Sequence, residues 1–166
     1  LVNPYIDVLR LFLTSFRIPL VICDLGCGDF NVGKELVKYS KRYVAVDIVK
    51  DLISHNKDNF KDDNLEFLCL DIAVDDLPSG GCAILRQVLQ HLSNAEVQSI
   101  LSKFTDFKYV ILTEHIPEVD FIPNKDIISG QGTRLKKQSG INVLAQPFNF
   151  KIKEGKQLLS VDLNDG

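Results

Sequence analysis

Acidic side chains end four of the five short apolar runs in residues 20–114. These run-end residues are Asp24, Asp47, Asp71 and Glu114. In an open parallel sheet, ligands bind outside the carboxyl ends of the strands. Four like charges at one edge lower stability unless a ligand or hydrogen-bond donors offset them. Helix capping is an equal alternative for any single aspartate, but the set as a whole favours a binding edge.

The first of these runs ends in a small, glycine-rich turn, which reads CDLGCGDF (23–30). Gly26 and Gly28 allow a tight backbone turn and the close approach of a ligand. The helix expected after the turn directs its positive N-terminal end to the same place. Asp47 ends the next strand, where a carboxylate can accept hydrogen bonds from both hydroxyls of a ribose. This combination predicts a nucleotide-cofactor site, although a glycine loop alone is a weak signal.

The glycine pattern disfavours a dinucleotide cofactor. A dinucleotide fingerprint needs a third glycine so that the pyrophosphate can rest on the helix, and Asn31 stands at that position. Asp29 also directs a negative charge towards the expected phosphates. A cationic amino acid joined to adenosine suits this acidic edge better. An oxidoreductase that uses a nicotinamide cofactor therefore remains only a weaker alternative.

Alternating short strands and helical stretches predict an α/β fold, a Rossmann-like doubly wound and mostly parallel sheet. The expected strands are 20–24, 43–47, 65–71, 82–86 and 108–114. The expected helices are 31–40, 50–60 and 94–104, the last with Asn94 as its cap, and an extra N-terminal helix covers 5–16. We expect one domain, 1–166, made of an N-terminal helix (1–17), a cofactor-binding core (18–114), an irregular lid-like segment (115–141) and C-terminal strands (142–166).

Four ordered blocks, DLGCGDFNVG, VAVDI, LEFLCLDI and LRQVLQHLSN, carry a resemblance to a known family. Together they resemble the class I (Rossmann-like) S-adenosylmethionine-dependent methyltransferases over residues 20–114. The resemblance implies about seven strands with the last one antiparallel, and the tail FNFKIKEGKQLLSVDL is typical of an antiparallel hairpin that turns at Glu154 and Gly155. Phe30 stands where the family often has glycine, so we expect its side chain to face away from the cofactor or to line the pocket mouth.

The resemblance implies S-adenosylmethionine as the cofactor, with S-adenosylhomocysteine as the product. The cofactor-binding residues that it implies are Asp24, Gly26, Cys27, Gly28, Asp47, Ile48, Asp71, Ile72 and Arg86. Asp47 would hold the ribose and Ile48 would pack against adenine. Asp71 would receive the adenine amino group. The main chain near Arg86 would receive the methionine ammonium.

The acceptor side of the site is less defined. His91 is the candidate general base, because an imidazole titrates near neutral pH; the alternative is a structural histidine at the start of a helix. Glu114, with His115 beside it, is the second catalytic candidate. The substrate-binding candidates are Tyr5, Gln87, His115 and Arg134. A surface-solvated Arg134 is an equal alternative to an acceptor-orienting one.

Absent motifs and charge favour a small-molecule or saccharide acceptor. The sequence has no [DNS]-P-P-[YF] after the fourth strand and no Pro-Cys pair, and its net charge is −3, from 19 basic and 22 acidic residues. We therefore expect no nucleic-acid partner. No apolar stretch is long enough to cross a membrane, so we expect a cytoplasmic protein without a membrane partner.

Two further sequence features concern metals and the runner-up function. The four cysteines form no C-x-x-C pair and the three histidines are scattered, so we expect no metal site. The leading hypothesis is methyl transfer to an oxygen or nitrogen of the acceptor. The alternative is a non-catalytic cofactor- or partner-binding module on the same fold, because fold alone does not decide between them.

Overall fold

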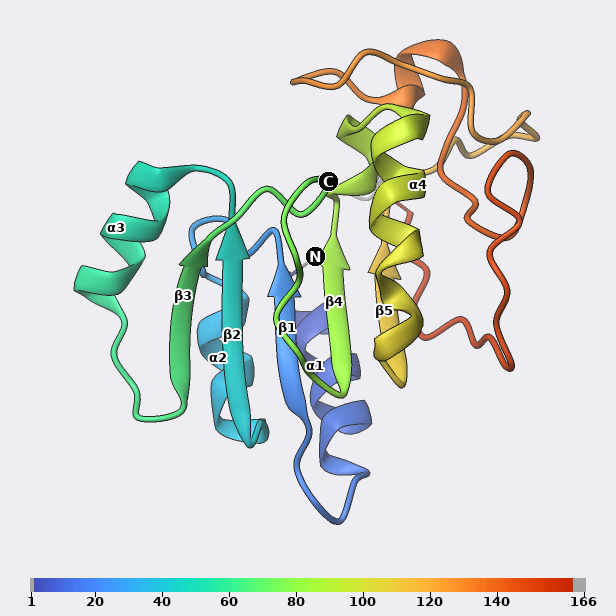
Figure 1. Ribbon diagram of the computed structural model, residues 1–166. Coiled ribbons are helices and arrows are strands. Elements are labelled where there is room, and N and C mark those ends of the chain that lie inside the picture. Colours follow the sequence, from blue (N-terminus) through green and yellow to red (C-terminus); the bar gives the residue numbers. More distant parts are fainter. Residues whose placement is uncertain (1, 163–166) are drawn as a thin grey trace.

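A five-stranded parallel sheet forms the centre of the molecule in a computed structural model that describes residues 2–162 (Figure 1). Its strands are β1 (Val21–Leu25), β2 (Arg42–Asp47), β3 (Leu65–Cys69), β4 (Cys82–Arg86) and β5 (Tyr109–Thr113). Their order across the sheet is β3-β2-β1-β4-β5. The chain therefore reverses direction across the sheet between β1 and β4, and such a switch point is where doubly wound folds bind ligands.

Helices cover both faces of the sheet. They are α1 (Val2–Thr14), α2 (Gly33–Leu36), α3 (Lys50–Asn59) and α4 (Asn94–Ser102), with short 3₁₀ turns η1 (Val37–Tyr39), η2 (Leu89–His91), η3 (Phe104–Asp106) and η4 (Arg134–Lys137). The helices α1, α2 and α3 contribute to one buried cluster, and α4 contributes to the other. The predicted α/β doubly wound architecture is confirmed.

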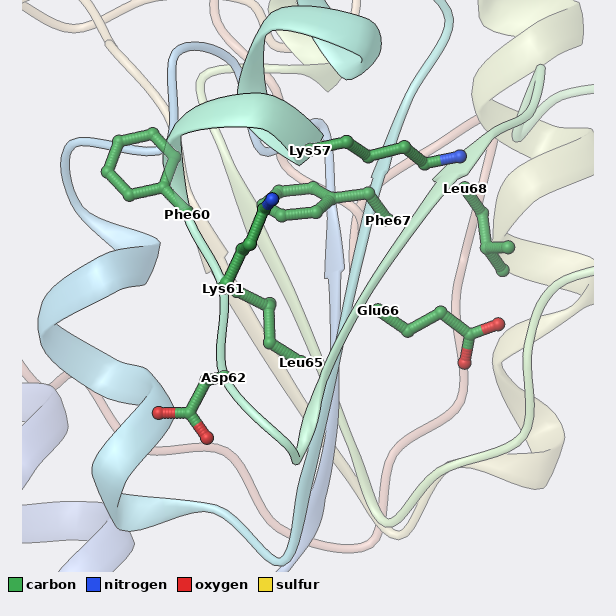
Figure 2. A pocket seen from close by; sticks show the side chains of 8 residues that line it. All are labelled: Lys57, Phe60, Lys61, Asp62, Leu65, Glu66, Phe67 and Leu68. Atoms are coloured by element: carbon green, nitrogen blue, oxygen red, sulfur yellow. The ribbon is translucent and has the colours of Figure 1, made fainter.

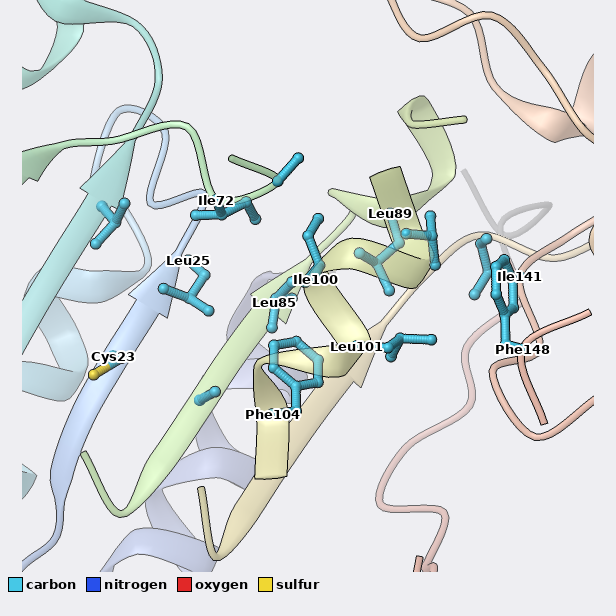
Figure 3. Packing of buried hydrophobic residues seen from close by; sticks show 14 of the residues in the cluster. Cys23, Leu25, Ile72, Leu85, Leu89, Ile100, Leu101, Phe104, Ile141 and Phe148 are labelled. Atoms are coloured by element: carbon cyan, nitrogen blue, oxygen red, sulfur yellow. The ribbon is translucent and has the colours of Figure 1, made fainter. Parts of the chain in front are cut away.

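The two buried clusters follow from the period of two in the strands. On β1, Ile22 packs towards α1 and α2, whereas Cys23 and Leu25 pack towards α4. Figure 3 shows the α4 cluster, in which Ile100 and Phe104 lie against the sheet. The inner strands β1, β2 and β4 are buried on both faces and read as nearly continuous apolar runs. The edge strands β3 and β5 are only partly buried.

Two helices differ in detail from the sequence prediction. The predicted helix 31–40 is a single α-turn, α2, followed by the 3₁₀ turn η1. The cap of α4 is Ser93 rather than Asn94. The Ser93 hydroxyl accepts the Glu96 amide, and the Glu96 carboxylate accepts the Ser93 amide, which makes a reciprocal capping box.

The predicted C-terminal hairpin does not form within the described residues. Residues 142–162 contain no strand, so the described sheet has five strands and not seven. Ile141 and Phe148 instead anchor this part of the chain in the α4 cluster, where irregular turns connect them. All of residues 151–162 except Leu158 are exposed, so they bury too little apolar surface to hold a strand in place. Residues 163–166 lie outside the described range.

No helix within residues 2–162 is long and apolar enough to span a bilayer.

Candidate cofactor site

The glycine loop between β1 and α2 is held by the end of β2. The amides of Gly26 and Cys27 both donate to the Val46 carbonyl, at 2.8 and 2.9 Å. Gly26 has φ +98°, and a Cβ atom there would lie 2.4 Å from Val88 Cγ2. Gly28 has φ +56°, but a Cβ atom there would meet no atom within 4 Å. The first glycine thus permits close packing, whereas the second leaves open space above the loop.

Asp47 ties the loop to the second strand. Its Oδ2 accepts the Gly28 amide at 3.0 Å, and its Oδ1 accepts the Val49 amide at 3.0 Å. Each carboxylate oxygen has a second lone pair for a ligand. Ile48 is 62% exposed beside this carboxylate, so the strand end presents an apolar surface next to a hydrogen-bond acceptor.

Asp71 lies beyond the end of β3 and is partly committed to its own turn. Its Oδ1 accepts the Ala73 amide at 2.9 Å, and its amide donates to Asp75 Oδ2 at 2.8 Å. Ile72 is buried in the α4 cluster. Asp71 therefore caps a turn and not a helix, and its expected contact with adenine stays a prediction.

A cavity of about 160 Å³ opens at the switch point between β1 and β4. Its lining residues are Tyr5, Asp24, Gly26, Cys27, Gly28, Asp29, Val32, Leu36, Tyr43, Ile84 and Arg86. Asp24 is 8% exposed, and burial raises the pKa of its carboxyl to about 6. The Tyr43 hydroxyl donates to Asp24 Oδ2 at 2.8 Å and, with the charge of Arg86, opposes that rise in pKa.

Tyr5, a predicted substrate-binding residue that was also expected to close over the cofactor from the first helix, lines this cavity. The Arg86 guanidinium lies over the Tyr5 ring, 5.6 Å from its centroid. Within residues 2–162 the buried Tyr5 hydroxyl has no hydrogen-bond partner of good geometry, although the nearby Thr113 side chain lowers its pKa. Burial outweighs that effect and raises the pKa, so the hydroxyl remains a donor.

Glu114, a predicted catalytic residue, holds the turn that follows β4. Its two carboxylate oxygens accept the amides of Leu89 and Gln90, at 2.9 and 3.2 Å. Burial raises the pKa of its carboxyl to about 7, against the effect of these backbone donors. The carboxylate is thus engaged with η2, the turn that carries His91.

His91 and Gln87 are fixed by contacts with later parts of the chain. His91 Nδ1 lies 3.0 Å from the Gly132 carbonyl, and a proton donated there leaves Nε2 as the acceptor nitrogen. Gln87 adopts φ +59° directly after β4, and its Nε2 lies 2.9 Å from His115 Nε2. Such left-handed backbone in a residue other than glycine is typical of functional sites.

Arg134 is not an exposed acceptor ligand in this structure. It is 1% exposed, and its guanidinium donates to the Leu89 carbonyl at 3.0 Å and to Asn94 Oδ1 at 2.6 Å. Burial lowers its pKa, while the charge of Glu114 acts in the opposite direction. Arg134 therefore joins the segment 115–141 to η2 and α4.

The segment 115–141 makes further contacts with the N-terminus of α4, where it lies in Figure 1. The Asn94 amide donates to Asp126 Oδ1 at 2.8 Å, and the Ser93 amide donates to Ser129 Oγ at 2.7 Å. None of the residues that line the cavity at the switch point comes from this segment. Its predicted role as a lid thus stays a prediction.

Two residues of the cofactor side were missed in the sequence. Tyr43 reads as an ordinary strand residue, yet it holds Asp24. Asn56 of α3 is fully buried and donates from Nδ2 to the Gly28 carbonyl at 2.8 Å. A polar residue at an apolar position of a predicted helix was the available signal for Asn56.

Phe30 faces away from the cavity, as one of the two sequence expectations stated. Its ring is fully buried and makes edge contacts with Tyr43, Phe60 and Phe67. A Cβ atom on Gly33 would lie 2.2 Å from this ring. A glycine three residues later thus makes room for the phenylalanine.

A larger hollow of about 460 Å³ lies elsewhere, at the outer edge of β3 (Figure 2). Its lining residues are Lys57, Phe60, Lys61, Asp62, Leu65, Glu66, Phe67 and Leu68. It shares no residue with the cavity at the switch point. Glu66 in this hollow is paired with Arg42. Size alone therefore does not identify the site, because Asp24 and the glycine loop line the smaller cavity.

The described residues contain no candidate metal site. Within residues 2–162 no three histidine, cysteine or acidic side chains are placed to hold a metal ion, and the four cysteines are free thiols.

Comparisons with known proteins agree on one family. The family model described as "Methyltransferase domain" matches residues 22–107. Malonyl-[acyl-carrier protein] O-methyltransferase of Acetivibrio thermocellus is 38% identical over 72 residues, which are 42% of this chain and 24% of that protein. The matched part thus spans about a quarter of the curated relative.

Solved structures of low sequence identity share the fold. Human N-acetylserotonin methyltransferase, in complex with SAM, matches with a TM-score of 0.56 and 21% identity over 70% of this chain and 34% of that one. Phosphoethanolamine N-methyltransferase 1 of Haemonchus contortus, in complex with phosphoethanolamine and S-adenosylhomocysteine, matches with a TM-score of 0.57 and 17% identity over 69% and 26%. The chain spans about a third or less of both structures.

Proposed function

The chain belongs to the methyltransferase domain family, and on that premise we propose that it binds S-adenosylmethionine and transfers the methyl group to an oxygen or nitrogen of a small-molecule or saccharide acceptor. One observation carries the proposal. The Gly28 amide is hydrogen-bonded to Asp47, and Gly28 lines the cavity that contains Asp24 and Arg86. The matched residues 22–107 include all four.

The residues of the cavity fit this cofactor chemically. Asp47 keeps lone pairs for the ribose hydroxyls, and the carboxylate of Asp24 suits a cationic group. Open space above Gly28 admits a ligand, and the buried Tyr5 hydroxyl is a donor that lacks a partner of good geometry among the described residues. When bound, S-adenosylmethionine supplies a methyl group activated by a sulfonium.

The chain's own contribution to methyl transfer is positioning and proton removal. We place the general base at His91, because a proton on Nδ1 donated to Gly132 leaves Nε2, which lies 3.4 Å from Gln90 Nε2, as the acceptor nitrogen. Glu114 orients the turn that carries His91. Acceptors named for the relatives, which are malonyl-[acyl-carrier protein], N-acetylserotonin and phosphoethanolamine, support oxygen or nitrogen as the methylated atom.

Calorimetric titration with S-adenosylhomocysteine tests the cofactor half of the proposal. We expect one binding site per chain, and no detectable binding by folded protein would remove the proposal. Asp47→Ala should weaken binding by about 1–3 kcal/mol, because a hydrogen-bond acceptor for a charged or polar ligand group is lost. Asp51→Ala, on the exposed side of α3, is the matched control and should leave binding unchanged.

Turnover is a separate measurement. Transfer of an isotopically labelled methyl group should be followed on a panel of glycans, nucleotide sugars and small carboxylic acids and amines. His91→Gln should lower the rate by about 10²–10⁴-fold at unchanged cofactor affinity if His91 is the base. An unchanged rate would show that His91 is a structural residue and not the general base.

A non-catalytic cofactor-binding module is the second candidate. It is favoured by the engagement of Glu114 and Arg134, two predicted acceptor-side groups, in contacts within the chain. Cofactor binding without turnover on the whole panel would support this candidate over the enzyme.

A further inference from the structure

The carboxylate of Asp24 is held at the cavity by one buried hydroxyl. Tyr43 is 0% exposed and donates to Asp24 Oδ2 at 2.8 Å. Within residues 2–162 no ion pair involves Asp24, and Arg86 lies over the Tyr5 ring instead. Tyr43 thus supplies the direct hydrogen bond to this carboxylate, whereas Arg86 acts on it from a greater distance.

The register of the sheet explains how Tyr43 reaches Asp24. Asp24 on β1 is paired with Ala45 on β2, and Tyr43 lies two residues earlier on the same face of β2. A diagonal neighbour on the next strand is within reach of an aromatic side chain. Edge contact between the Phe30 and Tyr43 rings, with centroids 5.8 Å apart, fixes the tyrosine ring. The hydroxyl is therefore preorganised before any ligand binds.

Several other titratable groups act on Asp24, and they come from every element around it. These groups are Tyr5 on α1, Cys23 on β1, Cys27 in the glycine loop, Asp47 at the end of β2 and Arg86 on β4. Burial and the charge of Asp47 favour the protonated carboxyl, whereas Tyr43 and Arg86 favour the carboxylate. Loss of the tyrosine hydroxyl would leave Arg86 alone to oppose burial.

We propose that Tyr43 is a positioning residue whose hydroxyl keeps Asp24 ionised and oriented towards the ammonium group at the amino-acid end of the cofactor. The inference rests on the proposed function, because it requires a ligand that carries positive charge. It adds to that function a residue outside the glycine loop, on the buried part of β2. It also gives cofactor binding a defined dependence on pH.

Titration of S-adenosylhomocysteine into wild type and Tyr43→Phe, from about pH 5 to 8.5, tests the inference. The pKa of the Asp24 carboxyl is about 6, so wild-type affinity should fall as the pH decreases through that region. Without the hydroxyl the pKa of Asp24 rises further, so the fall should begin about one pH unit higher. Near pH 6 the variant should bind about 5-fold more weakly, the difference should shrink to about twofold near pH 7, and the two should converge near pH 8.5.

Tyr39→Phe is the matched control, because it removes a hydroxyl from a partly exposed tyrosine of the same region. Its profile should coincide with that of wild type. Parallel profiles of wild type and Tyr43→Phe, displaced by a constant factor, would overturn the inference and assign Tyr43 to packing alone. Identical profiles would overturn it as well.

Asp24→Asn keeps the inference testable even if Tyr43→Phe folds poorly. This variant cannot ionise at residue 24, so the fall in affinity towards acid should disappear. In the Asp24→Asn background the additional Tyr43→Phe change should alter affinity by less than about twofold. An acid-dependent fall that persists in Asp24→Asn would overturn the inference. Absence of binding by wild type at every pH would instead remove the proposed function.

Discussion

The cofactor edge and the region after β4 and β5 are built from different kinds of contact. At the cofactor edge, the backbone of the glycine loop is bonded to the end of the adjacent strand, as in the pair Gly28 and Asp47. After β4 and β5, buried polar side chains join distant segments, as in the bond from Arg134 to the Leu89 carbonyl, which spans 45 residues. The first kind leaves a local pattern in the sequence, and the second does not.

Removal of Arg134 should produce the largest effect on stability. Arg134→Met leaves the Leu89 carbonyl and Asn94 Oδ1 without this donor and removes a charge that acts on Glu114. We expect a loss of about 2–4 kcal/mol and a fall in Tm of roughly 5–15 °C. Cofactor affinity should change by less than about twofold, because no residue of 115–141 lines the cavity.

Thermal unfolding and calorimetric titration of the same samples measure both effects. Lys136→Met, at an exposed position of the same turn, is the control and should leave Tm within about 2 °C. A large loss of affinity in Arg134→Met would mean that the two regions act as one unit. Cofactor binding would then depend on the contacts of Arg134.

Substitutions in the glycine loop should instead weaken cofactor binding. Gly26→Ala brings a Cβ atom to 2.4 Å from Val88 Cγ2 at a φ of +98°. We expect cofactor affinity to fall by about 10–100-fold, roughly 1.4–2.8 kcal/mol, because the loop must shift. In Gly28→Ala the added Cβ atom would meet no atom within 4 Å. Only the strain of the left-handed backbone, about 1–2 kcal/mol, should then lower the stability of the loop conformation.

Gly132→Ala is the matched control from the other region. A Cβ atom there would meet only Lys136 Nζ, at 3.9 Å, so affinity should stay at the wild-type value. Calorimetric titration ranks the three variants. An affinity for Gly26→Ala equal to that of Gly132→Ala would contradict the role given to the loop.

Most of the fold followed from the sequence, and so did the position of the glycine loop beside the end of β2. The class I methyltransferase resemblance is confirmed by the family match over residues 22–107. The inner strands β1, β2 and β4 are buried on both faces and therefore read as nearly unbroken apolar runs. All five strands were located. The hairpin was not, because an alternating pattern also occurs in exposed chain that has nothing to pair with, as in residues 151–162.

The misplaced site residues have a common physical cause. Tyr5 was expected to bind the acceptor and to close over the cofactor, and it lines the cavity at the switch point with Arg86 above its ring. Arg134 was expected at an acceptor or in solvent, yet it is buried. Tyr43 was missed because a tyrosine within a strand is typical of a core. All three depend on which side chains meet in space, and spacing along the chain does not record that.

Buried carboxyls in both regions should make stability depend on pH. The pKa values of Asp24 and Glu114 are raised to about 6 and about 7, from ordinary values of 3.8 and 4.5. The folded state therefore binds more protons than the unfolded state between about pH 4 and 7. The contribution of these groups to stability is fully present below the unfolded pKa values and is lost as the pH rises through about 6 and 7.

Glu114→Gln removes the pH-dependent contribution of Glu114 to stability and leaves that of Asp24. We expect the variant to lose less stability than wild type as the pH rises from about 5 to 8, with a difference of roughly 1–2 kcal/mol at the upper end. Denaturant unfolding at several pH values measures it. Glu154→Gln, at an exposed position, should follow wild type. A slope in Glu114→Gln as steep as that of wild type would assign the dependence to other groups.

The smallest effect is expected from exposed apolar side chains, which both regions carry. Ile48 is 62% exposed beside Asp47, and Ile128 is 95% exposed in the segment 115–141. Neither contributes to a buried cluster, so Ile48→Ser and Ile128→Ser should each change the free energy of unfolding by less than about 0.5 kcal/mol. Only Ile48→Ser should weaken S-adenosylhomocysteine binding, by about 1 kcal/mol, because apolar area that packs against adenine is lost. Calorimetric titration of both variants at one pH measures the difference, and equal affinities would remove the predicted adenine contact from Ile48 while leaving the ribose contact of Asp47 to its own test.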